Sequence, residues 1–281
     1  MGRVITRYGQ RQLVESIDKK LYQCTGRRNI GLSVAGDEVL FQKTDDNEGV
    51  VTAIQPRINE LKRQNKLIAA NIDQLWLVVA LEPHYEFELI DRYLIMAENV
   101  NLPINIIVNK IELAKNLEQV SRDFSIYKNI DYQVHFLSVK EEHNLDSLKS
   151  SLSDKTHIFL GQSGVGKSSL INTLIPDLDL RVDEISTKTK LGRHTTTNTT
   201  IYHIPSGGDL IDSPGIREFQ INEFSSKQIL NGYREFKSYL GKCRFRNCQH
   251  VNEPGCAIRG ALDSEVIHPA RYQSYINLIS E

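Results

Sequence analysis

The chain has 281 residues, of which 40% are hydrophobic and 25% are charged, and its formal net charge is −1. This length allows two or three domains with ordinary cores, and the balanced charge excludes attraction to nucleic acid by overall charge alone. The polar N-terminal residues lead us to expect no signal peptide, and the longest apolar run, Leu75 to Leu81, is too short to cross a bilayer. Three of the four cysteines lie within residues 243–256, which argues against a disulfide framework. We therefore expect a cytoplasmic protein with no contact to a membrane.

Residues 1 to about 60 contain short runs of alternating polarity that are separated by turn residues. The runs cover residues 3–8, 13–16, 21–24, 39–42 and 50–54. About five short strands in about 60 residues are typical of a small β-barrel, and the OB-fold is the commonest such module. The basic residues scattered among these strands allow contact with nucleic acid, and an ordinary solvated surface explains them equally well. Cys24 is expected to be an inert buried residue.

Strands and helices alternate after a polar segment at 57–66, which we interpret as a linker. Strands are expected at 75–80, 104–108, 132–137 and 157–160, and helices at 86–101, 118–130 and 144–152. Continuous apolar strands between amphipathic helices predict a parallel sheet with helices on both faces. Because ligands bind such sheets at the carboxyl ends of the strands, functional residues are expected directly after each strand.

The segment after the strand at 157–160 matches the pattern G-x-x-x-x-G-K-[ST]. It consists of Gly161, Gln162, Ser163, Gly164, Val165, Gly166, Lys167 and Ser168, and Ser169 continues into a helix. The glycines let backbone N–H groups approach phosphate oxygens, and the helix N-terminus adds a favourable dipole. Lys167 is expected to reach the β- and γ-phosphates, and the Ser168 hydroxyl to ligate Mg²⁺. The segment predicts a site for a nucleoside triphosphate; the alternative is a glycine turn that binds nothing.

The quartet Asn109, Lys110, Ile111 and Glu112 follows the strand at 104–108. In a guanine site the Asn side chain bonds the base edge, the Lys stem lies along the ring, and a carboxylate accepts from N1–H and N2–H₂. Adenine lacks this pair of donors, so Glu112 would provide the selectivity. An ordinary loop remains the alternative. Ser138, after the next strand, is where a further contact to the base is expected.

Two segments downstream of the phosphate loop have residues suited to sensing the γ-phosphate. Thr195, Thr196 and Thr197 follow His194 in a stretch rich in Thr and Lys, which is typical of a mobile Mg²⁺-binding loop but also of a plain surface loop. A hairpin over 198–204 and 209–211 leads into Asp212-Ser213-Pro214-Gly215. Asp212 is placed to hold Mg²⁺ through water, with Thr196 or one of its two neighbours as a further ligand, and the Gly215 N–H to contact the γ-phosphate.

The last 60 residues or so combine helices with a predicted metal site. A helix is expected from Ser225 or Ser226 to Leu240, and a last helical segment over 262–281, interrupted near Pro269. Between them, Cys243, Cys248, His250 and Cys256 form a Cys₃His set with the spacing of structural zinc, and four protein ligands leave no open position for catalysis. The nearby cations Lys237, Lys242, Arg244 and Arg246 form a basic patch that could meet phosphate backbones.

The base-reading quartet precedes the phosphate loop, and the Asp-x-x-Gly segment comes last, whereas in the common GTPase order the phosphate loop comes first and the quartet comes late. With Gly-Arg-His-Thr-Thr-Thr, Asp-Ser-Pro-Gly and the Cys₃His set, the whole chain resembles the RsgA (YjeQ) family of small-ribosomal-subunit biogenesis GTPases. The resemblance implies an OB-fold barrel at 1–60, a circularly permuted α/β P-loop GTPase domain at 61–221, and a mostly helical zinc-binding domain at 222–281. It also implies GTP/GDP with Mg²⁺, one structural Zn²⁺, and binding to the small ribosomal subunit and its rRNA, and nothing in the sequence suggests more than a monomer. Contact with that RNA would stimulate GTP hydrolysis during late maturation and release the factor.

Two positions depart from familiar patterns. The family's acidic base reader is usually Asp, and Glu112 shifts the carboxylate by about a bond length, so we expect weaker selectivity with GTP still preferred over ATP. Ile216 follows the Asp-x-x-Gly segment where Ras-like enzymes have a water-orienting Gln, which predicts slow intrinsic hydrolysis. His194 is a candidate catalytic residue beside Lys167; a positioning role or an RNA contact is the alternative.

Two other classes of protein contain phosphate loops. A P-loop kinase would need a substrate pocket and a lid, and would leave the quartet at 109–112 and the zinc ligands unexplained. A nucleic-acid-binding adaptor would hold its nucleotide only for structural reasons. Product analysis distinguishes the kinase, and turnover that rises with small subunits distinguishes the adaptor.

Overall fold

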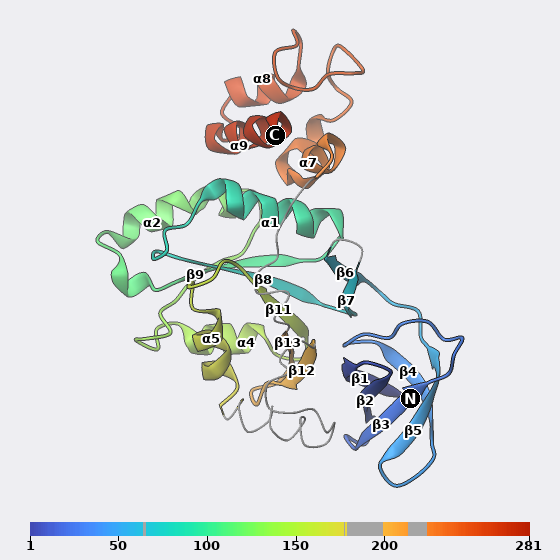
Figure 1. Ribbon diagram of the computed structural model, residues 1–281. Helices are drawn as coiled ribbons and strands as arrows, with labels where there is room; N and C mark the ends of the chain where they lie inside the picture. Colours follow the sequence, from blue (N-terminus) through green and yellow to red (C-terminus); the bar gives the residue numbers. More distant parts are fainter. Residues whose placement is uncertain (64–65, 177, 179–198, 213–223) are drawn as a thin grey trace.

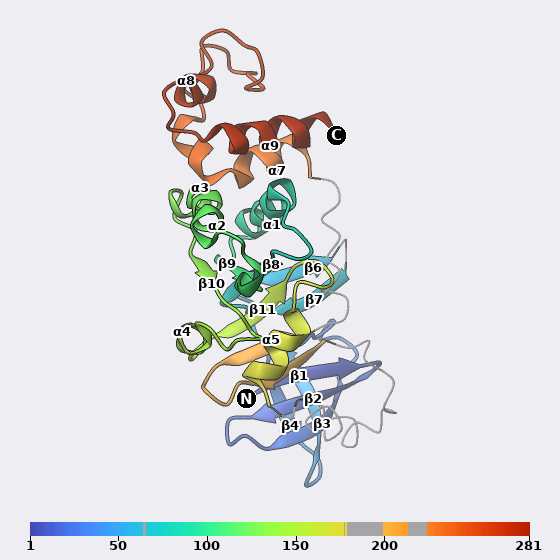
Figure 2. The ribbon, with the colours of Figure 1, turned by 90° about the vertical axis from the view of Figure 1, so that its left-hand side faces the viewer.

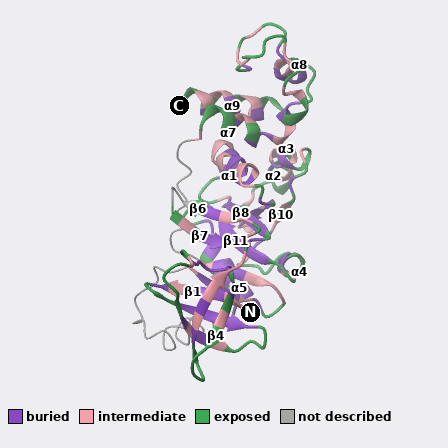
Figure 3. Ribbon diagram, turned by 90° about the vertical axis from the view of Figure 1, so that its right-hand side faces the viewer, coloured by how far each residue is buried: buried purple, intermediate pink, exposed green. Residues whose placement is uncertain are grey.

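The computed structural model describes residues 1–63, 66–176, 178, 199–212 and 224–281. Eleven strands of this part of the chain form one continuous sheet, in the order β10-β9-β8-β11-β13-β12-β1-β2-β3-β5-β4. Figures 1 and 2 show the parts stacked in a column, with the N-terminal barrel at one end, the central sheet and its helices in the middle, and the C-terminal helices at the other end. Buried residues follow the strands through this column (Figure 3).

The N-terminal strands close into a barrel, as the short alternating runs predict. They are β1 (Gly2–Tyr8), β2 (Arg11–Ser16), β3 (Leu21–Gly26), β4 (Glu38–Lys43) and β5 (Glu48–Ile54). Strand β1 pairs with both β2 and β4, and β3 pairs in parallel with β5, which completes the ring. Alternate side chains such as Val4, Val14 and Val51 fill its interior. Cys24 lies among them, and burial raises the pKa of its thiol to about 12, so it is inert as expected.

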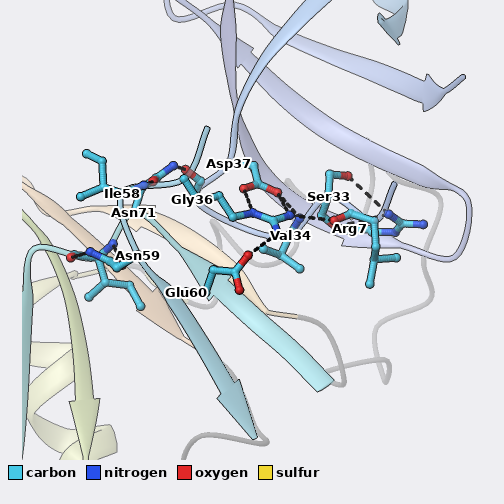
Figure 4. Close-up of polar contacts among 12 residues, drawn as sticks. Arg7, Ser33, Val34, Gly36, Asp37, Ile58, Asn59, Glu60 and Asn71 are labelled. Atoms are coloured by element: carbon cyan, nitrogen blue, oxygen red, sulfur yellow. Dashed lines mark hydrogen bonds and ion pairs between the residues drawn. The ribbon is translucent and has the colours of Figure 1, made fainter. Parts of the chain in front are cut away.

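The polar segment after the barrel is not the linker that the sequence suggests. Strand β6 (Glu60–Arg63) lies within it and pairs with β7 (Lys66–Ala70) as a hairpin. Arg57 anchors the segment, since its guanidinium donates to the fully buried Asp37 at 2.7 and 2.9 Å and to Glu60 at 2.8 Å. Figure 4 shows the carboxylates of Asp37 and Glu60 directed at the same guanidinium. Beside them, the Asn71 side chain donates to the Gly36 carbonyl oxygen and accepts from the Ile58 N–H. The charges thus fasten the barrel to the hairpin, which composition alone does not reveal.

The central sheet is parallel except at its edge next to the barrel. It consists of β8 (Gln74–Ala80), β9 (Ile104–Asn109), β10 (Val134–Phe136), β11 (Thr156–Leu160), β12 (Thr200–His203) and β13 (Asp209–Asp212). Strand β8 lies between β9 and β11, and all four predicted strands are present. The predicted hairpin is β12–β13, and its antiparallel strand β12 meets β1 at Thr200 and Thr6.

Helices cover both faces of this sheet, as expected. One face carries α1 (Phe87–Asn99), α2 (Leu117–Asp123) and α3 (Ser125–Lys128), and the other carries α4 (Leu145–Ser151) and α5 (Lys167–Leu174). Successive residues of β8 alternate between the two cores: Leu75, Leu77 and Val79 pack with α1, and Trp76, Val78 and Ala80 with α4 and α5. The single helix expected at 118–130 is broken at Phe124.

The C-terminal helices are shorter than the sequence predicts. They are α7 (Ser226–Gly232), the 3-10 helix η2 (Arg234–Tyr239), α8 (Ala257–Asp263) and α9 (Pro269–Ser280). Ser225 and Gln228 form a reciprocal cap at the start of α7. Tyr233 is extended and divides the helix expected up to Leu240, and α8 begins directly after Cys256, before the expected start at 262. The interruption near Pro269 is confirmed, because that proline opens α9.

The C-terminal helices pack on α1, where a buried ion cluster joins the two layers. Arg271 of α9 is 1% exposed and contacts Asp91 of α1, which is completely buried. Its guanidinium also donates to Glu235 at 2.7 and 3.2 Å, and lies 4.4 Å from the ring centroid of Tyr233. The Tyr127 hydroxyl donates to Asp91 at 2.9 Å.

Candidate nucleotide-binding site and metal centre

The phosphate loop joins β11 to α5 at the carboxyl edge of the sheet. Gly161, Gly164 and Gly166 adopt φ values of 133°, 83° and 95°, in the left-handed region that favours glycine. A Cβ at Gly161 would lie 2.1 Å from the carbonyl oxygen of Val78 on β8. The outer residues of the loop, Gln162 to Gly164, are exposed to solvent. Glycine is therefore required where the loop turns tightly against the sheet.

Lys167 is drawn into this loop. Its side chain is largely buried, at 7% exposure, and its ammonium donates to the carbonyl oxygen of Gly161 at 2.6 Å and to that of Gln162. Lys167 begins α5, and Ser168 and Ser169 follow it on the exposed side of the first turn. The ammonium and the helix N-terminus together place positive charge at the mouth of the loop, where an anion is stabilised.

Asn109 connects the phosphate loop to the segment predicted to contact the base. Its side-chain amide donates to the carbonyl oxygen of Val165 at 2.9 Å, and its Oδ1 accepts from the Val139 N–H at 3.3 Å. A Cβ at Gly166 would lie 2.3 Å from the same amide nitrogen. The two motifs are reversed in the sequence but adjacent in space, because β8 pairs with both β9 and β11. One nucleotide can therefore contact both.

The rest of the quartet forms a tight turn at the same edge. Lys110 has a φ of 60°, and its ammonium donates to the carbonyl oxygen of Glu82 at 2.6 Å. Ile111–Leu113 form the 3-10 helix η1, and the side chain of Ile111 is buried. One carboxylate oxygen of Glu112, Oε2, is buried without a hydrogen-bond partner among the described residues. A buried acceptor that lacks a donor is costly, and a ligand that carries N–H groups would satisfy it.

Ser138 lies in the loop that follows the neighbouring strand β10. It is 1% exposed, its hydroxyl accepts from the Glu141 N–H at 3.0 Å, and its backbone pairs with His143. The Ser138 hydroxyl thus stabilises its own loop, and the N–H of the neighbouring Val139 donates to the Asn109 side chain. Ser138 lies in the same loop as the residue that orients the quartet.

The predicted magnesium ligands are only partly described. Asp212 ends β13, whose neighbour β11 leads into the phosphate loop, and the Ser168 hydroxyl lies at the start of α5. A carboxylate and a hydroxyl oxygen are suitable donors for a hard cation such as Mg²⁺. Thr196, Gly215 and His194 lie outside the described residues.

The segment between β8 and α1 is a part of the site that the sequence analysis missed. Glu82 accepts from Lys110, and the Pro83 ring lies 3.5 Å from where a Cβ of Gly164 would be. Tyr93 of α1 lines a small cavity together with Gly161 and Gln162. Its position could have indicated a role in the site, because this segment follows an apolar strand at the carboxyl edge of the sheet. It contains no recognisable motif.

The four predicted metal ligands come together ahead of α8. The ligand atoms of Cys243, Cys248, His250 and Cys256 all lie within 4.8 Å of one another. The Nδ1 atom of His250 is 3.5 Å from the Cys243 sulfur and 3.4 Å from the Cys256 sulfur, and these two sulfurs are 4.0 Å apart. Tetrahedral zinc with bonds of about 2.3 Å to sulfur and about 2.0–2.1 Å to nitrogen sets its ligands about 3.5–3.8 Å apart. The residues therefore fit a zinc ion.

Backbone groups around this centre support the same assignment. The N–H of Ala257 points to the Cys243 sulfur at 3.3 Å, and that of Arg259 to the Cys256 sulfur at 3.5 Å. Such donors stabilise thiolates, which are the form that binds metal. The hydroxyl of Tyr272 donates to the His250 carbonyl oxygen at 2.7 Å. This bond supports the left-handed backbone conformation of His250.

A phosphate loop held against an Asn-Lys-x-acid turn defines a P-loop GTPase, and the order of the two motifs makes it a permuted one. The family model described as RsgA GTPase matches residues 54–222. Proteins described as small ribosomal subunit biogenesis GTPase RsgA, from Actinobacillus succinogenes and Haemophilus influenzae, are each 42% identical over 99% of this chain and 83% and 84% of their own length. The chain belongs to the RsgA GTPase family, and it is a GTP-hydrolysing enzyme.

Solved structures agree with this assignment. The crystal structure of YjeQ from Thermotoga maritima has a TM-score of 0.85 at 28% identity, over 99% of this chain and 96% of that one. A structure described as YloQ, a circularly permuted GTPase, has a TM-score of 0.80 at 28% identity, over 99% and 93%. The fold class predicted from the sequence is confirmed across the barrel, the permuted domain and the C-terminal Cys₃His region. No helix in the described ranges is long and apolar enough for a membrane span.

Proposed function

We propose that this enzyme hydrolyses GTP in contact with the small ribosomal subunit during late maturation, and that the subunit stimulates hydrolysis and thereby releases the factor. Its relatives are described as small ribosomal subunit biogenesis GTPases, and they match over nearly the whole chain. The small subunit and its rRNA would be the partner of a monomeric factor. The observation that carries the nucleotide part of the proposal is the bond between Asn109 and the phosphate loop at Val165.

Selectivity for guanine would come from Glu112. Its buried Oε2 needs a donor, and guanine offers N1–H and N2–H₂ where adenine offers no such pair. The hydrogen bond from Lys110 to Glu82 would hold the Lys stem beside the ring face. Val165, Gly166 and their neighbours in the loop would surround the phosphates, with Lys167 neutralising charge on the β- and γ-phosphates.

Hydrolysis would depend on groups at the end of β13 and in the loops around it. Mg²⁺, when bound, neutralises charge on the phosphates, and Ser168, Thr196 and Asp212 would hold it. Thr196 and Gly215 would close on the γ-phosphate and release after hydrolysis, changing the grip of the C-terminal region on rRNA. His194 would assist the attacking water, because Ile216 has no polar atom to orient it.

We further propose three functional units, at residues 1–60, 61–221 and 222–281. The barrel and the C-terminal unit would contact rRNA on either side of the GTPase unit, which the column-like arrangement in Figure 1 allows. The C-terminal unit would contain one structural Zn²⁺ on its Cys₃His set, for which the spacing of the ligand atoms is suitable.

The proposal is tested by measuring phosphate release from GTP with and without small ribosomal subunits. We expect slow basal turnover and a clear rise on adding small subunits, with no rise on adding large subunits. A rate that is the same in all three mixtures would refute the coupling. Transfer of phosphate to an acceptor in place of inorganic phosphate would indicate a kinase.

Glu112→Gln tests the base contact separately. The amide keeps the size of the side chain but places a donor or a weaker acceptor opposite the guanine N–H groups, so we expect GTP affinity to fall by roughly tenfold or more. Inosine triphosphate, which lacks the N2 amine, should lose less affinity than GTP does. Equal affinity of the wild-type protein for GTP and ATP would contradict the assignment.

A further inference from the structure

The first loop of the Cys₃His cluster, residues 242–247, holds an aromatic ring between two arginines. It lies in the C-terminal unit, at the opposite end of the column from the barrel (Figure 1). The ring lies outside the hydrophobic core of the unit, and Phe245 is 41% exposed while most large apolar side chains of the unit are packed in that core. A single exposed ring is common on protein surfaces, so the groups around Phe245 decide whether it belongs to a contact surface.

The loop is fixed at both ends. Cys243 and Cys248 belong to the metal-ligand set, so a bound metal would hold the two ends in place. Within the loop, the Cys248 N–H donates to the Phe245 carbonyl oxygen at 3.3 Å, which closes a tight turn. The Arg244 N–H donates to the carbonyl oxygen of Gly255 at 3.0 Å. The ring is therefore presented on a short and well-braced turn, and ordering it on binding costs little.

The charges around the ring all have one sign. Residues 236–252 contain four cations and no carboxylate, although the chain as a whole has a net charge of −1. Lys237 is paired with Glu98, whereas Lys242, Arg244 and Arg246 form no ion pair within the described part of the chain. Three thiolates with one Zn²⁺ would contribute a single negative charge beneath them, so the tip keeps an excess of about two positive charges.

The carboxylate that comes next in the sequence is held by its own loop. Glu253 accepts from the N–H groups of Gln249, Val251 and Asn252, at 2.8, 2.9 and 3.1 Å, so it is directed toward its own loop. The guanidinium of Arg244 lies 5.5 Å from the centroid of the Phe245 ring. A flat guanidinium beside a ring forms a surface on which a nucleobase can stack while phosphates meet the cations.

The geometry points to single-stranded RNA as the occupant of this tip, with one unpaired base stacked on Phe245 and the flanking phosphates on Arg244 and Arg246. This inference rests on the proposed function and specifies which part of the RNA the C-terminal unit takes. Bases in an A-form duplex remain stacked and inaccessible in a deep groove, so a duplex would use the cations but not the ring. An acidic protein segment would likewise neutralise the cations and leave the ring without a role.

The test compares binding of two RNA probes to the full-length, zinc-loaded protein by fluorescence anisotropy. One probe is an unstructured 12-nucleotide strand of uridines and adenines, and the other is a blunt duplex of the same length. We expect Phe245→Ala to weaken binding of the single strand by roughly 5- to 150-fold, the equivalent of about 1–3 kcal/mol for one stacked base. Duplex binding should not change, and Phe245→Trp should restore binding of the single strand.

The arginines should act differently from the ring. Arg246→Gln is expected to reduce the salt dependence of single-strand binding by about 0.7 in log–log slope for one phosphate lost. Phe245→Ala should leave that slope unchanged. Val266→Ala removes another exposed apolar side chain of the same unit, and Arg122→Gln removes an exposed cation of α2; both serve as matched controls and should bind as the wild type does.

Several results would overturn the inference. The first is failure of the wild-type protein to bind the single strand. The second is equal weakening of single-strand and duplex binding by Phe245→Ala. The third is that Phe245→Ala loses affinity for an acidic peptide and not for the single strand. Zinc content measured on each variant verifies that the loop is folded. Sedimentation with small ribosomal subunits separates this inference from the proposed function: if the wild type and Phe245→Ala bind subunits equally, the tip has no role, whereas failure of the wild type to bind subunits refutes the proposed function itself.

Discussion

Arg271→Met is expected to weaken the attachment of the C-terminal helices to the GTPase core. The substitution approximately keeps the length of the side chain and removes the positive charge that pairs with both the Asp91 and Glu235 carboxylates in the buried cluster described above. Asp91 is completely buried, and one of its oxygens, Oδ2, has no partner among the described residues. Burial raises the pKa of Asp91 while the charge of Arg271 opposes that rise, so loss of the guanidinium leaves only hydrogen bonds such as that from Tyr127 to oppose burial.

The size of the effect follows from this burial. Breaking one side of a buried ion pair costs about 3–5 kcal/mol, because the remaining charge is buried without a counter-charge. Loss of the guanidinium from the Tyr233 ring, 4.4 Å away, adds to this cost. With a urea m-value of about 2 kcal/mol/M for this part of the chain, the unfolding midpoint should fall by about 1.5–2.5 M.

Two probes separate the parts of the molecule. The single tryptophan, Trp76, is fully buried in the central sheet, so its fluorescence reports on the GTPase core. Circular dichroism at 222 nm includes the C-terminal helices as well. We expect the circular dichroism transition to move to lower urea in Arg271→Met and the tryptophan transition to move less.

A compensated variant distinguishes charge from packing. Removing all three charges, with Asp91→Asn, Arg271→Met and Glu235→Gln together, should recover most of the lost stability, since a neutral cluster has no unpaired charge. Arg122→Met, on an exposed side chain, is the matched control and should leave both transitions in place. Wild-type stability in Arg271→Met would refute the reasoning, as would a triple variant no more stable than the single one.

Two further predictions concern pH and metal. His203 bridges Asp209 at 2.5 Å and Glu15 of the barrel at 2.8 Å, and these contacts raise its pKa to about 9. A raised pKa contributes stability that is complete below the unfolded value of about 6.5 and is lost as the pH rises through about 9. The stability advantage of the wild type over His203→Gln should therefore be large at pH 6 and small at pH 9.5; an advantage that grew with pH would contradict the assignment. Removing zinc with a chelator should reduce helical circular dichroism and leave Trp76 fluorescence nearly unchanged; no loss of helical signal after one zinc equivalent is released would refute a structural role.

The sequence alone determined the local features of this protein. The phosphate loop, the alternation of apolar strands with amphipathic helices, the short strands of the barrel and the spacing of the Cys₃His set are all patterns among near neighbours in the chain. They identify the fold class because periodicity and turn chemistry are set by residues a few positions apart. The same local view misjudged residues 57–66, where Arg57 pairs with the distant Asp37, and it merged helices that end at Phe124 and Tyr233.

Only the tertiary structure decided how the distant pieces meet. Asn109 and Val165 are 56 positions apart and form a hydrogen bond because β8 places their strands on either side of itself. Arg271 and Asp91 are 180 positions apart, and in the sequence each is an ordinary surface charge. Burial depends on atoms that the chain brings together only when it folds. Burial in turn sets how strongly two charges interact and whether a carboxylate oxygen needs a hydrogen-bond donor. No pattern along the sequence records those neighbours.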